Sequence, residues 1–241
     1  MNKTNVYGVI LAGGIGSRMG NVEKPKQFLE IGGKPIIIHT IEKFVVNPVF
    51  ERIIVLSPRQ WIRYTQDAIR RYLPRCASID VIQGGATRNE TIMNSIRHIE
   101  EHYVLDEETV IVTHDAIRPF VTHRILEDNV RFAREFGACD TVIPATDTIV
   151  ESQDGARISS IPDRKAMYQG QTPQSFRARH LRDAYNSLTK EEKNILTDAC
   201  KILVLKNQDV HLVEGEIFNI KITYPHDLRM AEALLRGGLP C

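Results

Sequence analysis

Four glycines and three cations lie within eighteen residues near the N-terminus, in the stretch LAGGIGSRMGNVEKPKQF that follows the apolar run VYGVI. Backbone N–H groups of a glycine loop behind a strand can face phosphate oxygens. The planar guanidinium of Arg18 and the compact ammonium of Lys26 can stabilise charge that develops on a transferred phosphoryl group. The spacing therefore predicts phosphate chemistry; the alternative is that both cations are solvated charges beside a tight turn.

Two common phosphate-binding templates do not fit this loop. A P-loop needs a second glycine five residues after the first, followed by Lys and Ser or Thr, and none of Gly13, Gly14 and Gly16 is followed by that pattern. The dinucleotide fingerprint Gly-x-Gly-x-x-Gly begins at Gly14 but has Met19 at its third glycine position. Nucleotidyl transfer remains, in which a phosphate oxygen attacks the α-phosphorus of a nucleotide and pyrophosphate leaves.

Short apolar segments alternate with helical patterns along most of the chain. We expect strands over 7–11, 53–56, 79–82, 110–113, 141–143 and 210–213. Helices are expected from Pro35 through HTIEKF, over 61–73, 92–103, 125–136, 176–188 and 197–205, and after Pro225. The stripe Trp61, Tyr64, Ala68 and Tyr72 is interpreted as core-facing. This alternation is typical of βαβ units around a mostly parallel sheet.

One segment departs from that alternation. Residues 147–174 alternate between apolar and polar, break at Asp154-Gly155, and alternate again. The pattern predicts a β-hairpin arm that leaves the main sheet, with Asp-Gly at its turn. We interpret residues 1–241 as a single domain with this arm embedded at about 147–174. A two-stranded arm is marginally stable unless it packs against something, which favours association.

Composition excludes some classes of partner. The chain has 241 residues, with 31 Lys and Arg against 30 Asp and Glu, so it lacks the basic excess typical of general nucleic-acid or anionic-membrane binding. The apolar run near the N-terminus is too short for a signal peptide or a membrane span, and we expect a cytoplasmic protein. The cysteines are scattered without metal-site or disulfide-framework spacing.

Seven blocks in order along the chain resemble one family, the cytidylyltransferases that make CDP-activated polyol phosphates. After LAGGIGSRMG…KPKQF come GGATRNETI, VTHDAIRPF, DTIV, IPDRKAMYQGQTPQSF, LTDACKI and VEGEIFNIKIT. The resemblance implies a Rossmann-like nucleotidyltransferase fold, α/β, with a mostly parallel twisted sheet flanked by helices and a protruding β-hairpin arm. It also implies a homodimer that uses CTP, an alditol phosphate and Mg2+.

The resemblance assigns roles by position. Arg18 and Lys26 would stabilise the transition state. The nucleotide would contact Leu11, Ala12, Gly13, Gly14, Gly84, Gly85, Arg88, Asn89, Thr91 and Asp115. Asp115 would also hold the magnesium ion, the alternatives being a helix cap or an Arg118 partner. The acceptor would contact Arg164, Lys221, Thr148 and Thr172. His114 is interpreted as structural, because the attacking phosphate is already anionic and needs no base.

Two local differences bear on the acceptor. The methylerythritol phosphate enzymes typically carry an acidic residue where this chain has Phe218, and a TDDAS-like block where it has residues 197–200. The run MYQGQTPQSF resembles the ribitol-5-phosphate branch. We therefore expect conversion of CTP and D-ribitol 5-phosphate to CDP-ribitol and pyrophosphate, for teichoic acid or capsule synthesis. The alternative is the 2-C-methyl-D-erythritol 4-phosphate enzyme of isoprenoid synthesis. Asp198 is either an acceptor-hydroxyl ligand or a helix-start residue.

Two other classes of protein are open to test. A catalytically silent nucleotide-binding relative need not retain the cations and the carboxylate that this chain carries, namely Arg18, Lys26, Asp115, Arg164 and Lys221. An NAD-linked oxidoreductase is disfavoured by the failed dinucleotide fingerprint.

Overall fold

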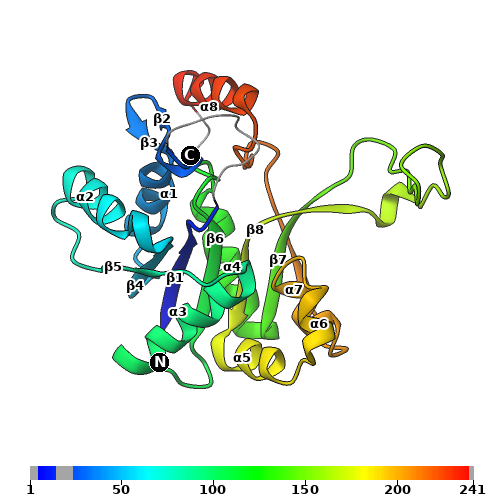
Figure 1. Cartoon of the computed structure of the whole chain (residues 1–241), viewed down its shortest axis with the longest axis horizontal. Coiled ribbons are helices and arrows are strands. Elements are labelled where there is room, and N and C mark those ends of the chain that lie inside the picture. Colours follow the sequence, from blue (N-terminus) through cyan, green and yellow to red (C-terminus); the bar gives the residue numbers. More distant parts are fainter. Residues whose placement is uncertain (1–4, 15–23, 239–241) are drawn as a thin grey trace.

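A seven-stranded sheet forms the centre of the molecule. The computed structural model describes residues 5–14 and 24–238, so Arg18 lies outside the described residues. The strands of this sheet, in chain order, are β1 (Val6–Leu11), β4 (Arg52–Ser57), β5 (Ile79–Gln83), β6 (Val110–Asp115), β7 (Ala138–Pro144), β8 (Tyr168–Arg177) and β9 (His211–Glu214). Their spatial order is β5-β4-β1-β6-β8-β7-β9 (Figure 1). Only β8 runs antiparallel to its neighbours, which confirms the predicted mostly parallel sheet.

Alternation along β1 builds a core on each face of the sheet. Val6 and Ile10 are fully buried on one face, and Tyr7 and Val9 are fully buried on the other. The first face is covered by α1 (Ile36–Val45), α2 (Ile62–Tyr72) and α4 (His123–Phe136). The second face is covered by α3 (Arg88–His102), α5 (Ala178–Asn186) and α7 (Cys200–Val204). The predicted α/β architecture is therefore present, with helices on both faces.

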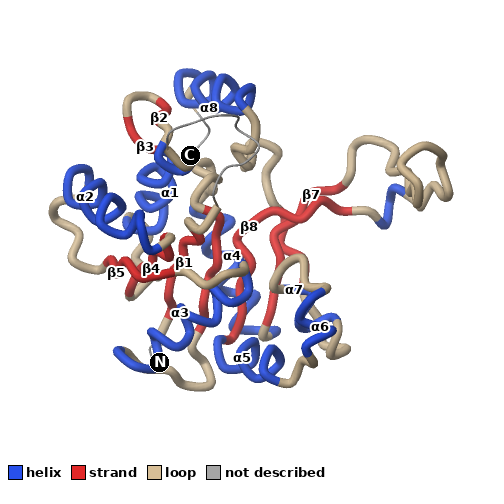
Figure 2. Tube along the Cα trace, in the orientation of Figure 1, coloured by secondary structure: helices blue, strands red, loops and turns tan. Residues whose placement is uncertain are grey.

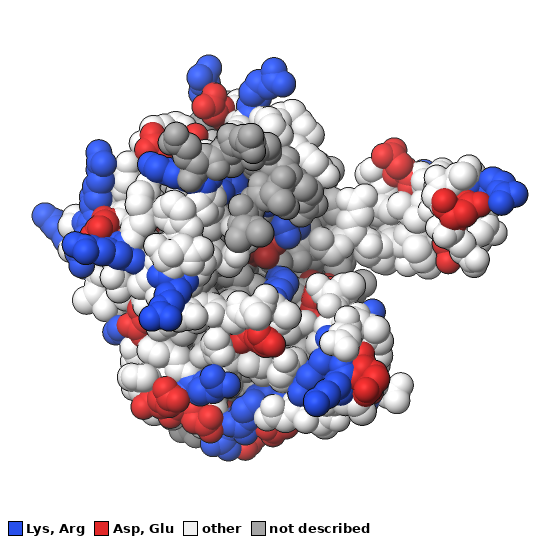
Figure 3. Space-filling view, viewed as in Figure 1, with Lys and Arg blue, Asp and Glu red and all other residues white. Residues whose placement is uncertain are grey.

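Smaller elements complete the molecule. The hairpin of β2 (Glu30–Ile31) and β3 (Lys34–Pro35) packs with α8 (Pro225–Gly237) around a third apolar cluster, and α6 (Lys190–Asn194) lies near α7 (Figure 1). Across the described residues, no helix combines the length and the apolar character needed to cross a membrane. Figure 3 shows basic and acidic side chains interspersed over the displayed face, as the balanced composition leads one to expect.

The aromatic stripe predicted for α2 packs inward. Trp61, Tyr64, Ala68 and Tyr72 are all partly buried against the first core. The ring of Phe28 lies 5.3 Å from that of Trp61 and 4.8 Å from that of Tyr64, measured between centroids. These contacts anchor the short 3-10 helix η2 (Lys26–Phe28), so the KPKQF segment is held against α2.

The segment 168–177 differs from expectation. We expected an arm strand up to 174 and a helix from 176, but Tyr168–Arg177 is one strand of the main sheet, paired with β7 and β6. Its inner part is buried, with Ser175 and Phe176 fully inaccessible to solvent. A short alternating run predicts a strand without identifying its partners, because strand pairing is set by contacts distant in sequence.

The projecting arm is consequently shorter than 147–174. It leaves the sheet after β7 and returns at β8, and it stands away from the body of the molecule (Figures 1 and 2). One bridge joins its two sides, between Glu151 and Ser160. Its turn lies at the expected Asp-Gly, where the Asp154 carboxylate accepts hydrogen bonds from the N–H groups of Ala156 and Arg157 and Gly155 has a φ of +71°.

Candidate functional site

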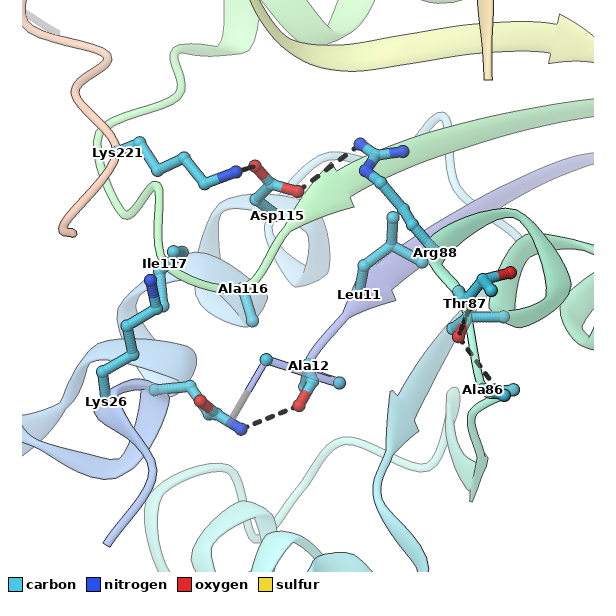
Figure 4. A pocket seen from close by; sticks show the side chains of 15 residues that line it. Leu11, Ala12, Lys26, Ala86, Thr87, Arg88, Asp115, Ala116, Ile117 and Lys221 are labelled. Atoms are coloured by element: carbon cyan, nitrogen blue, oxygen red, sulfur yellow. Dashed lines mark hydrogen bonds and ion pairs between the residues drawn. The ribbon is translucent and has the colours of Figure 1, made fainter. Parts of the chain in front are cut away.

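A cavity of about 300 Å³ opens where β1 and β6 end. These strands are parallel neighbours, and Leu11 stands opposite Asp115 in the register. Loops that follow parallel strands converge at such an edge, the usual place for ligands in α/β sheets. The lining residues are Leu11, Ala12, Gly13, Gly14, Lys26, Gln27, Gly85, Ala86, Thr87, Arg88, Thr91, Asp115, Ala116, Ile117 and Lys221 (Figure 4).

The first wall of the cavity combines the glycine loop with η2. Gln27 is only 1% exposed, and its Nε2 donates a hydrogen bond of 2.7 Å to the backbone oxygen of Ala12. Lys26 is 6% exposed and lies on the cavity wall beside that contact (Figure 4). Sequence reasoning did not identify Gln27, although it stands inside the quoted KPKQF motif. The bond to Ala12 fixes the segment that carries Lys26 against the loop.

The second wall is the loop between β5 and α3. The Thr91 hydroxyl accepts a hydrogen bond of 2.9 Å from the N–H of Gly85 and donates one of 2.8 Å to the backbone oxygen of Thr87. A Cβ on Gly85 would lie 2.5 Å from the Cβ of Glu90, so the close approach requires glycine. Because its proton is used within the loop, the Thr91 hydroxyl shapes this wall and has only acceptor capacity left for a ligand.

Asp115 is the electrostatic centre of the site. Its Oδ2 lies 2.8 Å from Lys221 Nζ and 3.6 Å from Arg118 Nε, and its Oδ1 lies 3.4 Å from an Nη of Arg88. Figure 4 shows Lys221 and Arg88 approaching the carboxylate from opposite sides. Burial acts to raise the pKa of Asp115, but the charges of Arg88, Lys221 and Arg118 outweigh burial and hold that pKa well below its usual range. The carboxylate is therefore ionised at any physiological pH.

A chain of hydrogen bonds through Thr172 and His114 fixes the backbone at Asp115. The Thr172 hydroxyl lies 3.2 Å from the backbone nitrogen of Asp115 and 3.0 Å from His114 Nδ1, and His114 Nε2 lies 3.0 Å from the backbone oxygen of Arg118. A carbonyl can only accept, so Nε2 carries the proton and Nδ1 accepts from Thr172. Burial lowers the pKa of His114 to about 4. His114 is thus a neutral structural group, as interpreted from the sequence.

Lys221 lies in the segment that follows β9, and two hydrogen bonds hold this segment in place. Asn219 is fully buried, and its Nδ2 donates a hydrogen bond of 2.9 Å to the backbone oxygen of Thr172. An Nη of Arg118 donates one of 2.8 Å to the backbone oxygen of Asn219. These bonds tie the segment to β8 and to the loop after β6, which brings the Lys221 ammonium to Asp115.

The structure gathers most, but not all, of the expected site residues. The cavity wall includes Lys26, Leu11, Ala12, Gly13, Gly14, Gly85, Arg88, Thr91, Asp115 and Lys221. Gly84 and Asn89 adjoin the second wall without lining the cavity, and Thr172 lies behind Asp115. Arg164 and Thr148 lie on the arm, away from the cavity of the same chain, where an Nη of Arg164 donates to the backbone oxygen of Thr146.

The arrangement suits a polyphosphate ligand. The cavity is lined by Lys26, Arg88 and Lys221 together with a single carboxylate, that of Asp115. The glycine loop at the end of β1 adds backbone N–H groups, which can bind phosphate oxygens. Within the described part of the chain, no three His, Cys, Asp or Glu side chains are placed to hold a metal ion together. One carboxylate combined with ligand phosphates is a common way to bind Mg2+, and Asp115 is the one carboxylate among the described residues that line the cavity.

One family model matches nearly the whole chain. A family model described as IspD, 2-C-methyl-D-erythritol 4-phosphate cytidylyltransferase, matches residues 6–237. That match spans both cavity walls, the arm and the segment that carries Lys221.

Solved structures give the same result. The Thermus thermophilus 2-C-methyl-D-erythritol 4-phosphate cytidylyltransferase is similar at 27% identity and a TM-score of 0.72, covering 97% of this chain and 100% of that one. The Francisella tularensis 2-C-methyl-D-erythritol 4-phosphate cytidylyltransferase is similar at 27% identity and a TM-score of 0.77, over 95% and 99%. The 4-diphosphocytidyl-2C-methyl-D-erythritol synthase of Anaerococcus prevotii, at 24% identity and a TM-score of 0.79 over 98% and 97%, shows the shared fold.

Substitution of Thr91 tests whether its hydroxyl holds the second wall in shape for CTP. We expect Thr91→Val to weaken CTP binding by about tenfold, because loss of hydrogen bonds worth roughly 1 kcal/mol each loosens the Gly85 loop. Thr91→Ser keeps the hydroxyl and should bind CTP like the wild type. Isothermal titration with CTP measures both; equal affinity in the Val variant would show that the loop holds its shape without this side chain.

Proposed function

This chain belongs to the 2-C-methyl-D-erythritol 4-phosphate cytidylyltransferase family, so it is a cytidylyltransferase, and we propose that it transfers the cytidylyl group of CTP to the phosphate of a polyol phosphate. The observation that carries this proposal is the gathering of Lys26, Arg88 and Lys221 with Asp115 at one edge of the sheet. Cations from three separate segments fit a reaction in which every reacting group is a phosphate.

The reaction needs positioning and charge stabilisation more than proton transfer. An oxygen of the acceptor phosphate attacks the α-phosphorus of CTP, a new P–O bond forms, and the bond to the β-phosphate breaks with its electron pair leaving on pyrophosphate. We assign Lys26 to the developing charge and Lys221 to the acceptor phosphate. Asp115 would hold Mg2+, which when bound neutralises phosphate charge. Arg18 keeps the transition-state role implied by the resemblance.

Two acceptors are candidates, and different observations favour each. The family model and the solved relatives at 27% identity favour 2-C-methyl-D-erythritol 4-phosphate. The local differences favour D-ribitol 5-phosphate, with CDP-ribitol as the product for teichoic acid or capsule synthesis. Phe218 is one of them: it packs against the apolar cluster beneath α8 and supplies no carboxylate to an acceptor.

Side-by-side turnover discriminates the acceptors. We expect pyrophosphate release only when CTP, Mg2+ and a polyol phosphate are present together, and kcat/KM is measured for D-ribitol 5-phosphate and 2-C-methyl-D-erythritol 4-phosphate under the same conditions. The acceptor with the higher value is the substrate. Saturable NAD(H) binding without CTP binding would contradict the proposed reaction altogether.

Lys26 should act mainly in the transition state. We expect Lys26→Ala to lower kcat by about 100-fold or more while CTP affinity changes much less, because the cation meets charge that grows as pyrophosphate leaves. The matched control is Lys24→Ala, since Lys24 is exposed and its Nζ contacts the Tyr64 hydroxyl at 3.4 Å. If Lys26→Ala lowers kcat by tenfold or less, Lys26 contributes mainly to substrate binding.

We also propose that the arm reaches the site of a second copy. Large apolar side chains are exposed along it, including Val150, Ile158 and Ile161. Such a surface on a slender projection is expected to be covered by a partner. In that dimer Arg164 and Thr148, which lie away from the cavity of their own chain, would contact the acceptor bound to the other chain.

Coexpression of two impaired variants, assayed at an acceptor concentration far below the wild-type KM, tests the exchange of arms. In a mixed dimer of Lys26→Ala and Arg164→Ala chains, the Arg164→Ala chain keeps its own Lys26 and receives an intact arm. We expect about a quarter of wild-type activity for random pairing, because half of the dimers are mixed and each has one complete site. Each variant alone should show little activity at this acceptor concentration, and sedimentation velocity should show a dimer. No recovery in mixed dimers would place Arg164 outside the partner's site.

A further inference from the structure

Three polar side chains meet on the face of the sheet that α3, α5 and α7 cover. Asp140 on β7 and Gln174 on β8 stand opposite each other in the strand register, and Gln174 Nε2 lies 3.5 Å from an oxygen of Asp198, which precedes α7. The other oxygen of Asp198 accepts a hydrogen bond of 2.9 Å from the backbone N–H of Lys201. Gln174 is only 3% exposed, so its amide is confined to this cluster, where the contact to Asp198 uses Nε2 alone.

The cluster leaves buried polar atoms without partners. Among the described residues, Asp140 Oδ1, Gln174 Oε1 and an Nη of Arg88 are each buried with no hydrogen-bond partner. Buried polar atoms are almost always paired, so orphaned atoms on neighbouring side chains need an explanation. Two of these are acceptors and one is a donor. The side chains of Asp140 and Asp198 remain partly exposed. A hydroxyl group of a ligand can therefore reach their carboxyl groups, and a hydroxyl can both donate to a carboxylate oxygen and accept from a guanidinium.

Arg88 connects the cluster to the cavity. One of its Nη atoms lies 3.4 Å from Asp115, while its charge also acts on Asp140. Gln174 stands two residues beyond Thr172, whose hydroxyl meets the backbone of Asp115. Burial, reinforced by the charge of Asp198, raises the pKa of Asp140 to about 7. Near neutral pH its carboxyl can therefore serve as a donor as well as an acceptor.

We propose, on the basis of the proposed function, that Asp140, Gln174 and Asp198 form the subsite that binds the hydroxyl groups of the acceptor's polyol chain. Arg88 then marks the boundary between this subsite and the phosphates beside Asp115. A buried site built to pair with hydroxyls rejects an acceptor that lacks them, because its own polar groups would stay unpaired. The subsite thus selects a linear, hydroxyl-rich polyol phosphate.

Kinetics of substitutions at Asp140 test this subsite. We expect Asp140→Val to raise the KM for the acceptor that the wild type turns over, D-ribitol 5-phosphate or 2-C-methyl-D-erythritol 4-phosphate, by about tenfold or more, while the KM for CTP changes less than about twofold. Asp140→Asn keeps the shape and one acceptor oxygen, and should recover part of the loss. Asp198→Ala provides a second probe from a half-buried position if the Val variant does not fold. The control is Asp80→Asn, a partly buried carboxylate paired at 2.7 Å with Arg52 on β4, at the opposite edge of the sheet.

The outcomes separate the subsite from the proposed reaction. Wild-type turnover is measured first, with D-ribitol 5-phosphate and 2-C-methyl-D-erythritol 4-phosphate. No pyrophosphate with either acceptor would overturn the proposed reaction and the subsite with it. Turnover by the wild type with an unchanged acceptor KM in the folded Asp140 and Asp198 variants would overturn the subsite alone. Equal rises in the KM values for CTP and acceptor would likewise assign the cluster to structure.

Discussion

The carboxylate of Asp115 and the cations around it constrain the rest of this structure. A buried carboxylate is costly unless opposite charges surround it, and here Arg88, Arg118 and Lys221 come from α3, the loop after β6 and the segment after β9. Those elements must therefore converge on one edge of the sheet. Three cations surround one carboxylate, so the cluster has a net positive charge. The phosphate groups of a ligand would balance that charge.

Rigidity behind this cluster follows from hydrogen bonds that span long stretches of sequence. Thr172 on β8 links the backbone of Asp115 to a neutral His114, and Asn219 links β8 to Arg118. Each of these groups is buried, so losing one partner would leave another unpaired. Catalysis by charge stabilisation depends on such preorganisation, because fixed charges need no rearrangement as the reaction proceeds. The projecting arm stands outside this framework.

Much of the fold was predictable because its signals are local. Alternation in β1, the helical stripe of α2 and the Asp-Gly turn of the arm each reflect a backbone period or a single special conformation. The position of Asp115 at a strand end was predictable for the same reason. The strand Tyr168–Arg177 was misassigned in part, because its character depends on pairing with β6 and β7. Gln27 was missed because a buried glutamine has no periodic signature.

The sequence by itself determined the family, the alternation of strands and helices, and the identity of the residues available for phosphate chemistry. Only the tertiary structure decided which of them act together. In the folded chain Lys221 forms an ion pair with Asp115, and the Thr91 hydroxyl forms hydrogen bonds within its own loop. Arg164 lies on the arm. The fold also joins Asp140 to Gln174 across two strands. The physical reason is that periodicity reports which face a residue occupies, whereas ion pairs and orphaned polar atoms arise only when distant segments are packed together.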